Sequence, residues 1–125
     1  MAATKLRDVI WESLGCTEAQ TKDIIDAMLS DVALFDRKQR DYGPGNIAKF
    51  GLTGVLVRSS DKIERLINLQ TISIDSVEYE PEANESIEDS WQDLSVYGAI
   101  ARVLMEDKWM CRGEPSIEQE VLDED

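Results

Sequence analysis

Two pairs of carboxylates in this chain are spaced so that each pair falls on one face of a helix. Asp61 and Glu64 are three residues apart, and Asp89 and Asp93 are four apart, so the members of each pair lie one helical turn from each other. Both pairs border apolar residues, and antiparallel packing of two such helices would bring four carboxylates together near the interior. Four clustered carboxylates repel one another, and a hard divalent cation with oxygen ligands is their natural counter-charge. The spacing therefore suggests a magnesium site, with Mn²⁺ as the alternative ion.

Basic residues accompany the first acidic pair. Arg58, Lys62 and Arg65 share its helix, and the last two each follow an acid directly. A metal ion beside a rim of cations is the arrangement that a nucleoside triphosphate requires, because the metal bridges phosphate oxygens and the bases bind the rest. The same spacing is also typical of an exposed helix face laced with charges, so spacing alone leaves both interpretations open.

The overall charge narrows the classes of function. The chain has 125 residues, with 26 acidic and 13 basic side chains, no histidine and a formal net charge of −13. Without histidine, Ser-His-Asp and Cys-His catalysis and histidine-ligated zinc are excluded. The negative charge argues against non-specific binding to nucleic acid or to an anionic membrane. The bases concentrate in residues 36–65, whereas 113–125 holds acids and no base.

Cysteine usage and hydropathy predict the compartment. Cys16 and Cys111 are far apart, and no CxxC motif occurs, which favours a reducing cytoplasm over a disulfide framework. No segment has the continuous apolar core of a signal peptide or the ~20 apolar residues of a membrane span. We therefore expect a cytoplasmic protein.

Apolar spacing predicts four helices joined by short links. The expected helices cover residues 4–14, Thr17 to about Arg40, a stretch starting at 51–54, and a stretch starting near Ser86. Thr17 with Gln20 forms a capping-box pattern, and the glycines and proline of 41–46 predict a loop. Residues 71–81 alternate in hydrophobicity and predict a short extended connector.

These elements predict an all-α fold, an antiparallel helical bundle of four to five helices. We expect one helical domain over residues 1–112 and an acidic, disordered tail over 113–125, since that tail has too little apolar surface to offset its ordering entropy. Trp91 is expected in the core of the bundle, and Val96, Ile100 and Val103 form an apolar face that suits an interface between subunits.

Read together, two segments resemble the nucleotide modification associated domain type 1 family of phages and bacteria: DRKQRDYGPGNIAKFGLTGVLVRSSDKIERLINL (36–69) and NESIEDSWQDLSVYGAIA (84–101). The shared order is an aromatic-glycine loop, a glycine-flanked helix start, DKxxRL, and an acidic helix with DxWxDL and a tyrosine. The resemblance covers about residues 28–106. The family in turn is similar to the all-alpha nucleoside triphosphate pyrophosphohydrolases, the MazG-like and dimeric dUTPase-like enzymes.

The resemblance implies magnesium held by an EExxE pattern on one helix and an ExxD pattern on a second. Asp61 and Glu64 match the first pattern, and Asp93 matches the final acid of the second. Asp89 stands four residues before Asp93, and Ser90 occupies the glutamate position of ExxD. The implied metal ligands are thus Asp61, Glu64, Asp89 and Asp93, with Glu64 or Asp89 as the base that activates water.

The resemblance also implies a nucleotide site. Its implied roles are phosphate binding, stacking on the base and contact with the base edge or ribose, and the residues that would fill them are Lys38, Tyr42, Asn46, Lys49, Arg58, Lys62 and Arg65. Packing beside the loop is the alternative role of Tyr42. Relatives in the superfamily assemble as dimers or tetramers, so a homo-oligomer is implied as well.

Two functions follow as hypotheses. The first is a magnesium-dependent nucleoside triphosphate pyrophosphohydrolase that acts on a canonical or modified (deoxy)nucleotide and releases a nucleoside monophosphate and pyrophosphate, in the host cytoplasm if the gene is a phage's. The alternative is a non-catalytic phage protein that binds or sequesters a nucleotide, or binds a partner. A helical interaction protein whose acidic tail mimics nucleic acid charge is a third interpretation.

Overall fold

The computed structural model describes residues 5–75 and 81–110, with the side chains of 71–75 and 81–86 left out. It contains five helices, which are α1 (Leu6–Ser13), α2 (Thr21–Tyr42), α3 (Gly45–Ala48), α4 (Gly51–Asp75) and α5 (Pro81–Met105). Over these residues there is no strand, so the all-α prediction is confirmed. None of the described helices is both long and apolar enough to cross a membrane.

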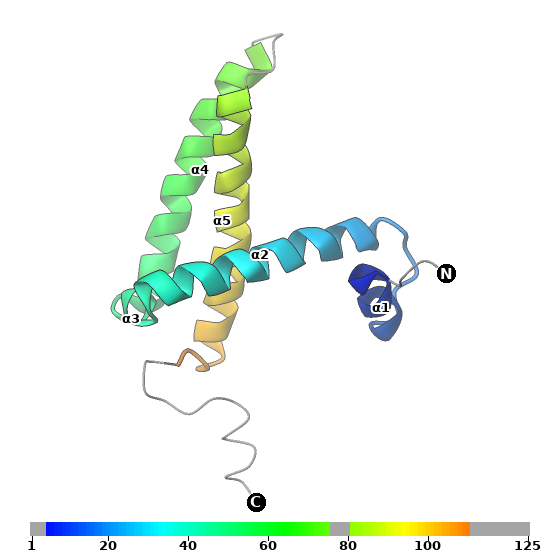
Figure 1. Cartoon of the computed structure of the whole chain (residues 1–125). Helices are drawn as coiled ribbons and strands as arrows, with labels where there is room; N and C mark the ends of the chain where they lie inside the picture. The colour runs from blue at the N-terminus through cyan, green and yellow to red at the C-terminus, as the bar shows by residue number, and fades with distance from the viewer. Residues whose placement is uncertain (1–4, 76–80, 111–125) are drawn as a thin grey trace, which may run out of the picture.

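The helices α4 and α5 form an antiparallel pair along most of their length, and α2 crosses this pair near the end where α4 begins (Figure 1). The short helix α3 sits at the turn between α2 and α4. The helix α1 packs only against the opposite end of α2, away from α4 and α5 (Figure 1). The chain thus has a crossing region, where α2 meets α4 and α5, and an arm, formed by α1 and the first turns of α2.

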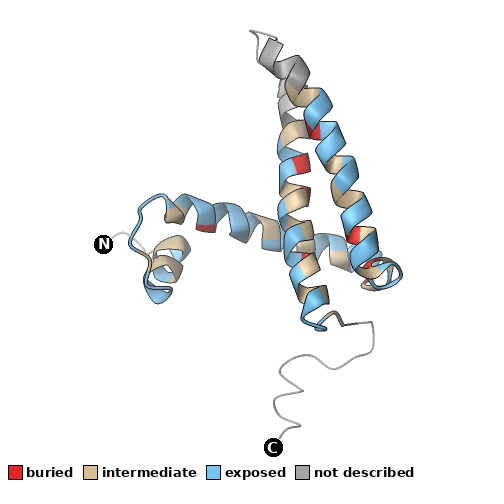
Figure 2. Cartoon of the chain, turned by 180° about the vertical axis from the view of Figure 1, so that it is seen from behind, coloured by how far each residue is buried: buried red, intermediate tan, exposed pale blue. Residues whose placement is uncertain are grey.

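A small apolar cluster holds the crossing region together. Ile47, Val55 and Ile100 are buried there, and Phe35 and Trp109 pack against them. The two aromatic rings meet edge to face with centroids 6.0 Å apart, a preferred geometry for aromatic pairs. Figure 2 shows that buried positions are few and scattered along the helices.

The turn after α2 fixes the direction of the next helices. Gly43 has φ 72° and ψ 171°, which favours glycine because a Cβ atom is strained there. Its N–H donates to the Gln39 carbonyl over 2.8 Å. The Trp109 indole N–H donates to the Pro44 carbonyl over 3.1 Å and ties the segment after α5 to this turn. The predicted loop at 41–46 is therefore shorter than expected, because α2 runs to Tyr42 and α3 begins at Gly45.

Three expected boundaries are wrong. The second helix begins at Thr21, with Gln20 at the N-cap, because the Thr17 hydroxyl bonds the Glu18 carboxylate instead of a backbone N–H. Residues 71–75 continue α4 as helix instead of forming an extended connector, and α5 already begins at Pro81, where proline is favoured in the first turn. Packing of α4 along α5 outweighs the short alternation of apolar and polar residues that predicted the connector. Residues 76–80 of the connector and the expected tail at 113–125 lie outside the described residues.

Trp91 is not in the core, and 52% of its surface is exposed. The helix α5 buries Ser90 and Asp93, and a helix turns by about 100° per residue. Trp91 therefore points about a quarter-turn or more away from the buried face.

Candidate functional site

A cavity of about 390 Å³ lies where α2 crosses α5, closed at one side by α3 and α4. Four elements contribute to its wall, so it exists only because the chain folds α2 back over the α4–α5 pair. Its lining residues are Leu34, Phe35, Lys38, Gln39, Tyr42, Asn46, Ile47, Arg58, Asp93, Val96, Tyr97 and Ile100.

The Asp93 carboxylate organises the polar side of this cavity. Lys38 from α2 reaches Asp93 Oδ1 over 3.0 Å, and Lys62 from α4 reaches Oδ2 over 3.0 Å. The Asp93 side chain is only 12% exposed, whereas half of Lys38 remains accessible. One carboxylate therefore links three helices and balances two cations at the edge of the cavity.

The environment of Asp93 favours its charged form. Burial raises the pKa of this carboxyl group, but hydrogen bonds and Coulomb attraction from Lys38 and Lys62 outweigh burial and hold the pKa below 3.8. A carboxylate next to two ammonium groups is stabilised in its ionised state. Asp93 is therefore an anion at neutral pH and orients both lysines.

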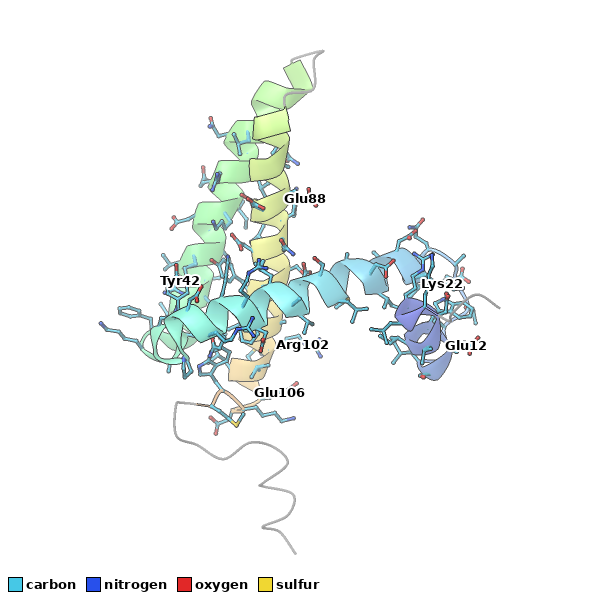
Figure 3. All side chains as sticks on the ribbon, viewed as in Figure 1. Glu12, Lys22, Tyr42, Glu88, Arg102 and Glu106 are labelled. Carbon is cyan, nitrogen blue, oxygen red and sulfur yellow. The ribbon has the colours of Figure 1, made fainter. Side chains whose placement is uncertain are left out.

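The remaining polar groups of the cavity differ in how far they are buried and in whether they have a hydrogen-bond partner. The Asn46 side-chain oxygen is buried and accepts no hydrogen bond from any described residue. Arg58 is half-buried in the wall, and Tyr42 is exposed at the C-terminal end of α2 (Figure 3). A cavity with an arginine, a partly accessible lysine, an unpaired acceptor and aromatic rings suits an anionic ligand with an aromatic group.

The structure brings together four of the seven residues expected to bind the nucleotide, namely Lys38, Tyr42, Asn46 and Arg58. A fifth, Lys62, reaches the edge of the cavity through Asp93. Two others are not part of the lining: Lys49 lies 5.5 Å from the centre of the Phe50 ring, and Arg65 is exposed further along α4.

The four expected metal ligands are placed differently from one another. Asp93 is buried, whereas Asp61, Glu64 and Asp89 are exposed. Among the described residues, no group of three or more carboxylate or thiol side chains is arranged to hold a metal ion. Both oxygens of Asp93 already bind lysines, so the residues as they stand do not form the octahedral oxygen set of Mg²⁺. The magnesium site and the catalytic roles of Glu64 and Asp89 remain predictions.

Sequence reasoning missed Tyr97 as a residue of the cavity. Tyr97 follows Asp93 by four residues, and this spacing places both on one face of α5. The spacing was therefore a signal that was available in the sequence. The pairing of Asp93 with Lys38 had no such signal, because these residues are 55 positions apart.

Comparisons of the chain with family models, curated protein sequences and solved structures found no match. The family resemblance thus remains a prediction from the two segments that carry it.

Proposed function

We propose that the cavity binds a nucleoside triphosphate or a related nucleotide. The observation that carries the proposal is the convergence of Lys38, Tyr42, Asn46 and Arg58 on one cavity, from three helices. All four are residues for which the family resemblance implies contact with a nucleotide.

The proposed contacts follow from the chemistry of each group. Lys38 and Arg58 donate charge-assisted hydrogen bonds to phosphate oxygens, and a planar guanidinium binds two such oxygens at once. The unpaired oxygen of Asn46 accepts a hydrogen bond from the base or the ribose. The exposed ring of Tyr42 covers a face of the base.

Calorimetric titration with each common ribo- and deoxynucleoside triphosphate tests this proposal. For the nucleotide that binds, Lys38→Ala is expected to weaken affinity by about 10-fold or more, as loss of a charge-assisted hydrogen bond predicts. The matched control is Arg37→Ala, because Arg37 is the neighbouring cation on α2 and lies outside the cavity lining. Equal losses in both variants, or no binding of any nucleotide by the wild type, would contradict the proposal.

Pyrophosphohydrolysis dependent on Mg²⁺ is the second candidate. One observation favours it: the Lys62–Asp93 ion pair sets the stretch of α4 that carries Asp61 and Glu64 beside the stretch of α5 that carries Asp93. Asp89 lies one turn from Asp93. Two carboxylate pairs thus occupy neighbouring stretches of paired helices, as the resemblance to the pyrophosphohydrolases implies.

Release of pyrophosphate in the presence of Mg²⁺ separates this candidate from a protein that only sequesters the nucleotide. An enzyme is expected to lose turnover in Asp61→Ala while Lys5→Ala, a change in the exposed N-terminal segment, leaves it intact. Nucleotide binding without turnover would leave the sequestering function as the conclusion.

A further inference from the structure

One face of α4 lies against α5 along the antiparallel pair (Figure 1), and a lysine belongs to this face. Val55 of α4 packs in a cluster with Ile100 of α5. Seven residues further along α4 and seven residues back along α5, Lys62 meets Asp93, so one register relates both contacts. Leu66, one turn beyond Lys62, is buried again. The row of α4 that faces α5 therefore carries Lys62 between two buried apolar residues, and its side chain is 25% exposed.

The two acids beside Lys62 lie off this row. A helix turns by about 100° per residue, so Asp61 is rotated from Lys62 by about 100° and Glu64 by about 200°. Both acids are exposed, in agreement with these rotations. At the level of Asp93, the face that α4 turns toward α5 thus presents an ammonium group and not a carboxylate.

The facing side of α5 contributes one carboxylate. Among the described residues of α5, the buried polar side chains are those of Ser90 and Asp93. Asp89, which precedes Asp93 by one turn, is exposed. The surface between the two helices therefore brings one buried carboxylate against lysines, and does not bring two carboxylate pairs against each other.

The pairing with Asp93 leaves donors on both lysines. An ammonium group has three N–H donors, and Lys38 and Lys62 each place their ammonium 3.0 Å from an oxygen of Asp93. Up to two N–H groups on each lysine are therefore left for a ligand. Half of the Lys38 side chain is accessible. Asp93 thus fixes the position of two ammonium groups at the edge of the cavity without using up their donors.

The charges around this carboxylate favour an anion over a cation. Arg58 lines the same cavity as Lys38 and Asp93, and Lys62 joins them through its ion pair. Positive groups therefore outnumber the single carboxylate of the lining. Coulomb repulsion from these groups disfavours a divalent cation at this place, whereas the same charges attract phosphate.

We propose that the cavity binds the phosphate groups of a nucleotide as a free anion, with the Lys62 ammonium in the place that a divalent cation takes in a metal-dependent site. The inference rests on the nucleotide binding proposed above, and it opposes the second candidate, Mg²⁺-dependent pyrophosphohydrolysis. Lys62 donates to a phosphate oxygen, and Asp93 acts on the ligand through the lysines, whose direction it fixes.

Calorimetric titration of the wild type in two buffers of equal ionic strength, one with EDTA and one with Mg²⁺, tests the inference. The probes are the common ribo- and deoxynucleoside triphosphates. We expect binding in EDTA, and we expect Mg²⁺ to leave the affinity unchanged or to lower it by up to about 10-fold, because Mg²⁺ on a triphosphate cancels charge that the lysines attract. An affinity that rises with Mg²⁺ would overturn the inference and leave nucleotide binding in place. Absence of binding in both buffers would overturn both.

A charge-removing variant tests the role assigned to Lys62. Lys62→Met keeps a long unbranched side chain without its charge and is expected to weaken affinity in EDTA by about 10-fold or more. Mg²⁺ is expected to restore part of this loss, about 3-fold or more, because Asp93 then has an oxygen without an ammonium partner and a cation can take that place.

The matched control is Lys22→Met. Lys22 is likewise partly buried, with 31% of its side chain exposed, and pairs with Asp8 over 3.1 Å, but it belongs to the arm. Its loss is expected to change affinity by less than about twofold, and circular dichroism checks that both variants remain helical. Equal losses in the two variants, or a Lys62→Met variant that gains nothing from Mg²⁺, would overturn the role of Lys62. If Lys62→Met does not fold, the wild-type comparison decides the inference by itself.

Discussion

The crossing region and the arm are both built from helices with charged surfaces, but their charges do different things. In the crossing region, Asp93 is nearly enclosed and binds lysines from two other helices. In the arm, Arg7 pairs with Asp23 and Asp26, and Lys22 pairs with Asp8, between helices that follow each other in the chain. No residue of α1 is buried. Ion pairs thus line a cavity in the crossing region, whereas in the arm they lie on the surface.

This difference shows which ion pairs depend on the packing of helices that are distant in the sequence. The pairs of the arm are local and solvated, and exposed pairs of this kind contribute little to stability. The Asp93 pairs join residues that meet only when α2, α4 and α5 have all assembled. We therefore expect the cavity to be lost when the crossing region is loosened and to survive when the arm is loosened.

The largest expected effect comes from shortening a buried side chain in each region. Ile100→Ala removes the centre of the crossing-region cluster and is expected to lower the free energy of unfolding by about 2–4 kcal/mol. Ile25→Ala, at the buried residue of α2, is expected to raise amide hydrogen exchange mainly in α1 and the first turns of α2. Hydrogen exchange by mass spectrometry follows both, and uniform exchange throughout the chain in Ile25→Ala would show that the two regions unfold as one.

Removing the central carboxylate has the next largest effect. Asp93→Ala leaves the ammonium groups of Lys38 and Lys62 without their partner and is expected to cost about 1–3 kcal/mol in the free energy of unfolding. Urea denaturation measures this cost. A change no larger than that of an exposed carboxylate such as Asp36, which pairs with Arg40 at the surface, would contradict the organising role of Asp93.

Lowering the pH is expected to remove the contribution of the Asp93 charge to the free energy of unfolding. Because the pKa of Asp93 is lower in the folded chain than its ordinary value of 3.8, the stabilisation is present above that value and is lost as the pH falls through the folded pKa. The difference in unfolding free energy between the wild type and Asp93→Asn should therefore shrink as urea denaturation is repeated below pH 3.8. If the difference between the two proteins stays constant as the pH falls, the charge of Asp93 does not stabilise the folded chain.

The smallest effect is expected in the arm. Asp8→Ala breaks the ion pair with Lys22, and because both side chains are partly exposed, the loss should be below about 1 kcal/mol. Thermal unfolding in low and high salt measures it, since salt screens exposed pairs. A loss as large as that of Asp93→Ala would erase the distinction between the two regions.

The fold class could be predicted from the sequence because helical spacing is a local property, whereas several residues of the cavity were named through the family resemblance. Helical spacing located the helices, and the aromatic-glycine segment with its neighbours pointed to Lys38, Tyr42, Asn46 and Arg58. Spacing along one helix does not say which element covers it. For that reason Trp91 was assigned to the core although it is exposed.

Ion pairs between different helices could not be predicted from patterns within one helix. Lys62 was expected to bind phosphate, yet in the fold it binds Asp93 from a neighbouring helix. Asp93 was expected to bind a metal ion, which stays a prediction, and in this fold its two oxygens bind ammonium groups of two other helices. Neither pairing could be predicted, because no spacing within one helix reveals which residues of other helices lie beside it.

We propose above all that the cavity around Asp93 binds a nucleotide. Its most direct test compares Arg58→Ala with Arg65→Ala by calorimetric titration of the same nucleotide, because both arginines belong to α4 and only Arg58 lines the cavity. We expect an affinity loss of about 10-fold or more for Arg58→Ala and an unchanged affinity for Arg65→Ala. A larger loss in Arg65→Ala, or wild-type affinity in Arg58→Ala, would contradict it.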